Sequence, residues 1–464
     1  MKIHNIELGI LALLLTLAAC AAVDGGESAE EPAADEPEVT TLIYAVLTPE
    51  DINIESIKRF NREHKDVQIE ARNYARLSEN GKSGVDLLMV ELATGQVPDI
   101  FDFGSSGQLC QLSYRELAKK GFLEELWPYI LNDPDTRNGE LIMQSFLKPA
   151  EVDGGLYTIY GGVYIQTLMG AESVVGDRYS WTVGDMLEAF EAMPNGEAIW
   201  DNVTGYSVTP SLKRYLLSSY MTGFIDLFID WDNGQCFFDG PQFRELLELI
   251  NSLPDTPQES DWMSECKTLD EINAMHELRL RKGETMLFFE RLNDLINPRI
   301  AKVFFGEPSV PAGYPLGDGT VGSYYVPGTN MLAMSSTCKD KDAAWEYMRQ
   351  MIVDRNQKHT YSYGGLPVSR PLFNLQAKSS WYSTKWNVAV ANDIVIPLEK
   401  EYSEGLYQLE DYFDTITHCS LFLEPSVLEF ILEEASAYFA GDLTLDQTAG
   451  RIQSRATLYV NERM

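Results

Sequence analysis

Apolar and polar positions along the chain follow two periods that predict alternating strands and helices from about residue 40 onward. Residues 41–47 (TLIYAVL) form a short β-rich run, and residues 67–71 alternate between apolar and polar as a strand does. Apolar residues at helical spacing predict helices over 50–63 and 84–94, and another strand follows at 99–103. This alternation is typical of a parallel sheet covered by helices, which binds ligands at the carboxyl ends of its strands.

Residues that typically begin and end helices divide the remainder of the chain. Thr182 opens the sequence T-V-G-D, a capping box, and the C-terminal region carries a long apolar stripe between a Pro and a Gly. Such signals predict five further helices: from Thr182 to Pro194, from Pro241, over 339–352, from Pro425 to Gly441, and from Thr444 onward.

The first 19 residues have the pattern of a secretory signal. Lys2 precedes an apolar run over residues 8–19, which is shorter than the roughly 20 residues of a spanning helix. The run ends in Leu17-Ala18-Ala19-Cys20, which resembles the lipobox of bacterial lipoproteins. The resemblance implies a signal peptide over 1–19, cleavage before Cys20, and diacylglycerol and palmitate on the Cys20 thiol. An ordinary signal peptide that happens to contain a Cys remains the alternative, and Glu7 departs from a purely basic start.

Residues 20–39 predict a lipidated Cys followed by a disordered acidic linker. Positions 21–39 hold seven acidic residues and no Lys, Arg or aromatic residue. Such a segment cannot bury enough apolar surface to offset its ordering entropy, and its charges repel one another. We therefore expect a spacer that holds a folded body away from a lipid surface.

Charge excludes two classes of partner. The chain has 36 basic and 70 acidic residues, which give a formal net charge of −34. Its length of 464 residues predicts two or three domains. Such an acidic surface repels phosphate backbones, so no nucleic-acid partner is expected, and no basic patch is available for anionic lipid. Solubility is the simplest consequence of the acidity.

The reactive residue types do not form a recognisable metal or cofactor motif. Apart from Cys20, the cysteines are scattered and odd in number, and sequence alone does not pair them: Cys110, Cys236, Cys266, Cys338 and Cys419. We expect most of them to be small buried residues. The run Asp230 to Asn233 lacks the spacing of a calcium loop and predicts a turn. No metal and no cofactor are predicted.

Eight segments, in order, resemble the family 1 extracellular solute-binding proteins of carbohydrate-type ABC importers, the group that includes maltose-binding protein. They are 60–67 (FNREHKDV), 94–100 (TGQVPDI), 155–164, 181–182, 281–286 (RKGETM), 343–347 (AAWEY), 365–368 (GLPV) and 433–462. Two departures concern contacts in the second lobe. Ile159-Tyr160 replaces a common Pro, and Leu168-Met169-Gly170 replaces a usual Tyr-Asn.

The resemblance implies an α/β, two-lobed periplasmic-binding-protein fold of type II. Each lobe would be a mixed, mostly parallel sheet flanked by helices, with hinge strands between the lobes. Lobe one would comprise 40–159 plus 289–335, and lobe two 160–288 plus 336–464. A solute captured in the cleft between them would favour a closed state, which the ABC permease subunits then recognise.

Candidate ligand residues follow from this picture and from the chemistry of sugars. A pyranose offers an apolar face to aromatic rings and hydroxyls to planar polar groups. Strand ends, crossing segments and two turns supply such groups at Thr48, Asp102, Phe103, Ser105, Tyr160, Tyr164, Trp231, Phe289, Glu290 and Tyr363. Each has an alternative as a core or turn residue, and a buried pair with Arg291 is the alternative for Glu290.

We therefore predict a monomeric, non-enzymatic lipoprotein that captures a sugar or oligosaccharide for an ABC importer. Its location would be the cell membrane, anchored through lipid on Cys20 and facing the extracellular side, or the periplasm in a two-membraned cell. The alternatives are a secreted glycan hydrolase with Asp102 and Glu290 as its carboxylates, a binding subunit for a membrane sensor kinase, and a carrier of peptides or another polar solute.

Overall fold

The computed structural model describes residues 39–462, except 49–53, 80–81, 106–111, 177–179, 205–206, 257–260, 329, 354–364 and 392–393. The predicted signal peptide, the lipidation site Cys20, the acidic linker up to residue 38, Cys110 and Tyr363 lie outside the described residues. Residues 39–464 form one compact unit. Within the described part of the chain, no helix combines the length and apolar character needed to cross a membrane.

The first sheet has the strand order β14-β5-β1-β2. Its strands are β1 (Thr40–Val46), β2 (Val67–Asn73), β5 (Ile100–Ser105) and β14 (Asn330–Met334). β1 runs parallel to both β2 and β5, while β14 pairs antiparallel with β5. The predicted strands at 41–47, 67–71 and 99–103 are confirmed, and so is the mixed, mostly parallel character of this sheet.

The second sheet is built around β6 (Gly162–Ala171) and has eight strands in the described residues. Its main path is β18-β13-β6-β11-β7-β8, and β12 and β15 also pair with β6. The bounds are β7 (Val203–Thr204), β8 (Ser207–Val208), β11 (Leu287–Leu292), β12 (Ser309–Pro311), β13 (Tyr324–Pro327), β15 (Leu366–Pro367) and β18 (His418–Cys419). Three hairpins stand apart from both sheets: β3 (Ser78–Glu79) with β4 (Lys82–Ser83), β9 (Ile229–Asp230) with β10 (Gln235–Cys236), and β16 (Asn387–Val390) with β17 (Ile394–Pro397).

The second sheet is mixed but not mostly parallel, so that part of the expectation is wrong. β11, β12, β13 and β15 all pair antiparallel with β6, and only β11–β7 and β13–β18 are parallel. In a βαβ unit the helix carries the chain back, so that the second strand runs parallel to the first. The segments that pair with β6 run in the opposite direction to it. Local periodicity does not reveal which way a distant segment returns.

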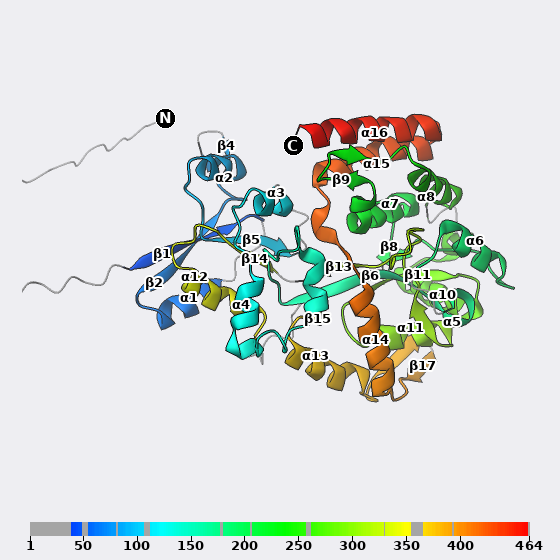
Figure 1. The fold of residues 1–464 in the computed structure, drawn as a ribbon. Coiled ribbons are helices and arrows are strands. Elements are labelled where there is room, and N and C mark those ends of the chain that lie inside the picture. Colours follow the sequence, from blue (N-terminus) through cyan, green and yellow to red (C-terminus); the bar gives the residue numbers. More distant parts are fainter. Residues whose placement is uncertain are drawn as a thin grey trace, which may run out of the picture. The chain divides into compact units, whose positions relative to one another are not determined.

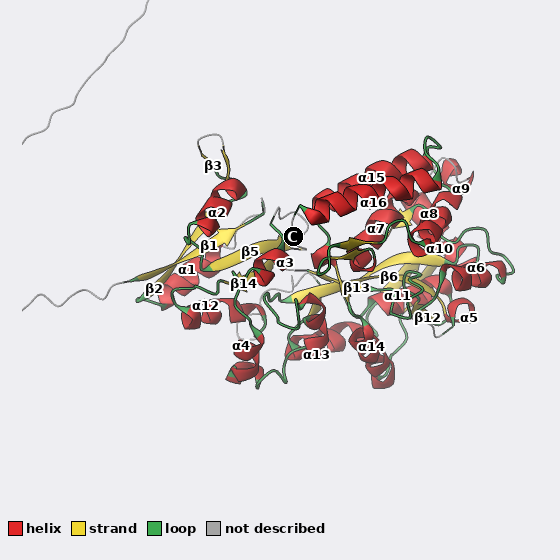
Figure 2. Cartoon of the chain, turned by 45° about the horizontal axis from the view of Figure 1, so that its top comes forward, coloured by secondary structure: helices red, strands yellow, loops and turns green. Residues whose placement is uncertain are grey.

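Helices cover both faces of the second sheet (Figures 1 and 2). α7, α8, α15 and α16 lie on the face toward which Leu168 points, and α10, α11, α13 and α14 lie on the face toward which Met169 points. The bounds are α1 (Ile54–Glu63), α2 (Gly84–Ala93), α3 (Tyr114–Lys119), α4 (Trp127–Asn132), α5 (Glu172–Val175), α6 (Val183–Glu191), α7 (Leu212–Phe224), α8 (Pro241–Ser252), α9 (Asp261–Glu265), α10 (Leu269–Lys282), α11 (Asn297–Phe305), α12 (Lys341–Met348), α13 (Arg370–Gln376), α14 (Ser403–Thr415), α15 (Pro425–Phe439) and α16 (Leu445–Asn461). Adjacent residues of β6 thus point into two different hydrophobic clusters, as a pleated strand requires.

Helix ends follow the predicted capping residues. The Thr182 side chain accepts a hydrogen bond from the Asp185 N–H, and the Asp185 carboxylate accepts one from the Thr182 backbone N–H. Thr444 and Gln447 form the same capping box at the start of α16. Pro241 and Pro425 occupy the first positions of α8 and α15. The predicted helices at these four places are confirmed.

Strand pairing bears on the predicted lobe boundaries. β11 and β12 belong to the second sheet, although residues 289–311 were assigned to lobe one. α12 packs in the first sheet's core, where the Tyr347 ring lies edge-on to Tyr44 at 5.7 Å. The division into lobes itself stays a prediction.

Candidate functional site

One face of the second sheet gathers aromatic and polar side chains. Tyr164 and Gln166 alternate along β6 on the face of Leu168, and Phe289 and Arg291 alternate along β11. Arg291 lies opposite Gln166 in the antiparallel register, so their side chains leave the sheet on the same face. The Arg291 guanidinium carbon lies 4.4 Å from the centre of the Tyr164 ring. Tyr164 is half-buried and Arg291 is exposed, so this face can meet a ligand.

Packed aromatic rings adjoin the site on the same face of the sheet. Phe289 stacks with Trp200 at a centroid distance of 6.5 Å, and the Tyr215 ring from α7 meets Phe289 edge-on at 4.8 Å. Burial raises the pKa of the Tyr215 hydroxyl, and hydrogen bonds with Ser219 and Gln166 oppose the shift. Burial likewise raises the pKa of Tyr164 against the lowering effect of Arg291. Both phenols therefore stay protonated at neutral pH and keep an O–H donor.

The carboxyl ends of β1 and β5 meet at Thr48 and Asp102. Asp102 is buried, and its carboxylate accepts hydrogen bonds from the Tyr44 hydroxyl (2.5 Å), the Gly104 N–H (2.9 Å) and the Asn330 amide (2.8 Å). Gly104 has a φ of 73°, and a Cβ there would lie 2.6 Å from the Thr48 side chain. The contacts of Asp102 thus organise three strands of the first sheet.

The remaining predicted ligand residues fall in several environments. Phe103 is buried and packs edge-on against Tyr114, with ring centres 5.9 Å apart. Ser105 ends β5, where its backbone is in register with Asn330. Tyr160 is fully buried, and its hydroxyl donates to the Phe146 carbonyl at 2.7 Å.

Trp231 is half-buried in the turn between β9 and β10, where it packs against the cluster beneath α7 and α8. Tyr164 and Phe289 are thus the two predicted residues that the structure brings together on one sheet face. The ligand roles of all ten stay predictions.

Glu290 lies on the opposite face of β11 from Phe289 and Arg291. Its carboxylate lines a cavity of about 60 Å³ between α10 and α11, and it accepts a hydrogen bond from the Asn297 amide at 3.2 Å. Burial raises the pKa of Glu290 to about 7, and a backbone hydrogen bond at Arg291 partly offsets that rise. The side chain of Arg291 lies on the Tyr164 ring, so the two residues do not form the buried pair that was the alternative.

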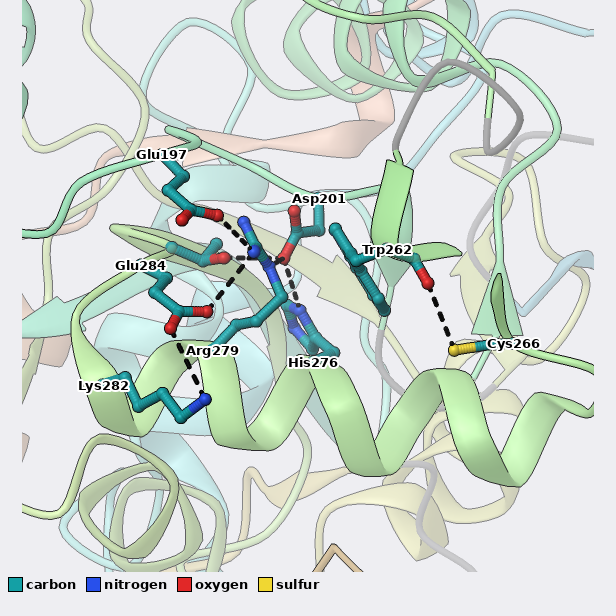
Figure 3. Close-up of polar contacts among 9 residues, drawn as sticks. Glu197, Asp201, Trp262, Cys266, His276, Arg279, Lys282 and Glu284 are labelled. Carbon is teal, nitrogen blue, oxygen red and sulfur yellow. Dashed lines mark hydrogen bonds and ion pairs between the residues drawn. The ribbon is translucent and has the colours of Figure 1, made fainter. Parts of the chain in front are cut away.

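A second group of charged residues fastens α10 to the sheet (Figure 3). Asp201 is buried and accepts from Thr285 Oγ1 at 2.7 Å, while His276 Nδ1 and Arg279 Nε lie 3.0 and 3.4 Å from its carboxylate. Burial alone would raise the pKa of Asp201, but His276, Arg279 and Thr285 outweigh it and hold the pKa below its usual value. Arg279 also donates to Glu197 at 2.7 Å. The group is a fully paired structural network.

The acidic turn at Asp230 and Asp232 is a turn, as predicted. Asp230 Oδ1 accepts from the N–H groups of Asp232 and Asn233, each at 3.0 Å. Among the residues that the structure describes, no cluster of His, Cys, Asp and Glu has the arrangement of a metal site. The four described cysteines, Cys236, Cys266, Cys338 and Cys419, are free thiols, and three of them are buried.

Sequence reasoning missed Gln166, Arg291, Tyr215 and Trp200. The alternation of side chains along a strand could have identified Gln166 and Arg291. Each lies two residues from a predicted ligand residue and therefore on the same face of its strand. Tyr215 and Trp200 reach Phe289 only through tertiary packing, which leaves no local signal.

Comparisons with known proteins fit this architecture. A family model described as bacterial extracellular solute-binding protein matches residues 55–390. An oligogalacturonide-binding protein from Yersinia enterocolitica superposes with a TM-score of 0.50 at 14% identity, covering 91% of this chain and 99% of that chain. The sugar-binding protein MalE from Xanthomonas citri gives a TM-score of 0.49 at 14% identity, covering 91% and 98%. A family 1 extracellular solute-binding protein from Alicyclobacillus acidocaldarius gives 0.48 at 16% identity, covering 92% and 100%. No curated protein sequence matches the chain.

Because the matched residues span well over half of its length, the chain belongs to the family of bacterial extracellular solute-binding proteins. The family places it outside the cytoplasm, in the extracellular space or the periplasm. Members of this family bind solutes, and the mixed α/β architecture agrees with the two-lobed fold expected from the sequence.

Proposed function

We propose that this protein captures an oligosaccharide and delivers it to the permease of an ABC importer, without catalysing a reaction. The observation that carries the proposal is the face formed by Tyr164, Gln166 and Arg291. A half-buried aromatic ring beside an exposed guanidinium matches the apolar face and the hydroxyls of a sugar. The Yersinia relative of the same fold binds oligogalacturonide by its description, which supports a glycan as the solute.

The hydrolase alternative is not favoured. It requires Asp102 and Glu290 to flank one glycosidic bond. Asp102 instead accepts hydrogen bonds from Tyr44, Gly104 and Asn330 within the first sheet, and Glu290 faces a small cavity behind β11. No described feature favours a sensor-kinase partner over a permease.

The binding proposal is tested by thermal unfolding of the purified protein against oligosaccharides, peptides and amino acids. A ligand at 100 times its Kd should stabilise the folded state by about 2.7 kcal/mol, which is a clear rise in Tm. Replacing Tyr164 with Ala should remove most of the rise, whereas replacing the exposed Tyr407 with Ala should leave it unchanged. A shift from peptides with none from any glycan would contradict the carbohydrate proposal.

We further propose that the mature protein is a lipid-anchored monomer, attached to the outer side of the cell membrane through Cys20. The support is the apolar run that ends in Leu17-Ala18-Ala19-Cys20 and the acidic segment behind it. Replacing Cys20 with Ser should abolish labelling by a palmitate analogue and release the protein into the soluble fraction. Continued labelling of that variant would contradict the proposal.

A further inference from the structure

Arg291 is a cation without an ionic partner at the candidate binding face. It is exposed on β11, its guanidinium lies over Tyr164, and no carboxylate among the described residues forms an ion pair with it. Arg279 on the adjoining helix α10 shows the contrast, because it pairs with Glu197, Asp201 and Glu284.

The contact with Tyr164 leaves the donors of Arg291 available. A guanidinium that lies on an aromatic ring uses its flat face, and its N–H groups point outward in the plane. Those N–H groups form a fork that matches a carboxylate in two parallel hydrogen bonds. The tyrosine ring also restricts the rotamers of Arg291, so less side-chain entropy is lost when an anion binds.

Gln166 adds a second planar polar group directly across from Arg291. The two residues are opposite each other in the antiparallel register of β6 and β11. Tyr164 on the same strand offers the apolar surface that a pyranose ring requires. One sugar unit at this place would therefore meet the accessible part of an aromatic ring and an unpaired cation, while the Gln166 amide is buried and hydrogen-bonded with Tyr215.

We propose that the solute is an acidic oligosaccharide, and that Arg291 receives the carboxylate of one of its uronic acid units. The inference rests on the proposed capture of a glycan and specifies its class. The net negative charge of the protein repels such a ligand at long range, but salt screens that repulsion beyond about 8 Å in physiological buffer. At contact distance the two hydrogen bonds to Arg291 decide the preference.

The test is calorimetric titration of the purified protein with matched glycans. The probes are trimers of galacturonate, glucuronate and mannuronate, each beside its carboxyl-reduced counterpart, with maltotriose and a sulfated trisaccharide. Wild-type protein should bind one uronate trimer at least tenfold more tightly than the reduced counterpart. A hydrogen-bonded charge typically contributes a factor of about 10 to 100, so R291Q should lose that much affinity for the acid. Its affinity for the reduced sugar should change less than about threefold.

Two further variants separate recognition from folding. R291K keeps the positive charge but cannot form the bidentate pair of hydrogen bonds with a carboxylate, so it should bind the acid with intermediate affinity. R62Q removes an exposed arginine from α1 and should behave as wild type. All three variants should keep the Tm of the unliganded wild-type protein, because both arginines are exposed.

Several results would overturn the inference. If a reduced or neutral glycan binds as tightly as its acid, or if R291Q weakens both equally, the acidic class is wrong while glycan capture stands. Binding of the sulfated sugar alone would contradict the carboxylate. Failure of every glycan to bind would overturn the proposed function itself, and this inference with it.

Discussion

At the residue scale, the carboxylates of Asp102 and Glu290 differ in the number of hydrogen-bond donors around them. Asp102 accepts from three donors within the first sheet. Glu290 accepts from the Asn297 amide, and none of the described Lys, Arg or His side chains forms an ion pair with it. A buried carboxylate with few donors favours its neutral form. Burial accordingly raises the pKa of Glu290 to about 7.

This raised pKa predicts that the stability of the protein falls as the pH rises. Between the usual value of 4.5 and about 7, the folded state holds a proton on Glu290 that the unfolded chain has released. The contribution is fully present below pH 4.5 and is lost as the pH rises through about 7, with a magnitude of about 1–3 kcal/mol. Thermal unfolding from pH 4 to 9 measures it.

The variant Glu290→Gln supplies the control, because glutamine resembles the protonated acid and still accepts from Asn297. We expect it to lose this part of the pH dependence and to be at least as stable as wild type above pH 7. A wild-type profile that parallels that of the variant would show that Glu290 does not titrate in this window.

Single residues of the site were predictable only in part. Tyr164 and Phe289 follow from their places in the crossing segments, and the structure brings them to one sheet face. Tyr160 was chosen for the same reason, yet its hydroxyl bonds to Phe146 in the core. Which face of a strand meets solvent depends on the layers packed against it, and the local sequence of residues 159–164 does not contain that information.

At the element scale, local signals predicted helix ends better than strand partners. Capping boxes at Thr182 and Thr444 satisfy backbone N–H groups within four residues, so their effect is local. The antiparallel neighbours of β6 come from segments up to about 200 residues away along the chain. Their pairing depends on the course of the whole chain, which no short window records.

The docking of α10 predicts a large effect of one buried arginine. Arg279 is buried and forms an ion pair with Asp201 (Figure 3). Replacing Arg279 with Met therefore removes the arginine partner of a buried carboxylate. Breaking a buried pair on one side typically costs about 3–5 kcal/mol. We expect Arg279→Met to lower the free energy of unfolding by about that amount, as measured by chemical denaturation.

Lys282 on the same helix offers a matched control. Its ion pair with Glu284 is 3.5 Å long, and the Lys282 side chain is 58% exposed. Exposed pairs contribute about 0–1 kcal/mol, so Lys282→Met should be nearly neutral. Equal effects of the two substitutions would mean that the network around Asp201 does not stabilise α10.

At the scale of the whole folded unit, ion pairs join α3 to the turn between β9 and β10. Arg115 and Lys119 both contact the Asp232 carboxylate, with Arg115 at 2.9 Å. α3 packs beside the first sheet through Tyr114 and Phe103, whereas the turn packs on the second hydrophobic cluster through Trp231. These contacts therefore connect the first sheet to the second hydrophobic cluster.

Removing this connection should favour a more open arrangement. Each partly exposed pair contributes about 0.2–1 kcal/mol, so Asp232→Asn, which weakens both, should change the balance of open and closed states by about 2- to 30-fold. We expect a larger radius of gyration in small-angle scattering of the ligand-free variant, and the same change in wild type at 1 M salt, where the pairs are screened. Asp446→Asn breaks the pair with Arg244 between α16 and α8, on one side of the second sheet, and should leave the radius unchanged. If Asp232→Asn and high salt also leave the radius unchanged, the ion pairs at α3 do not control the opening of the molecule.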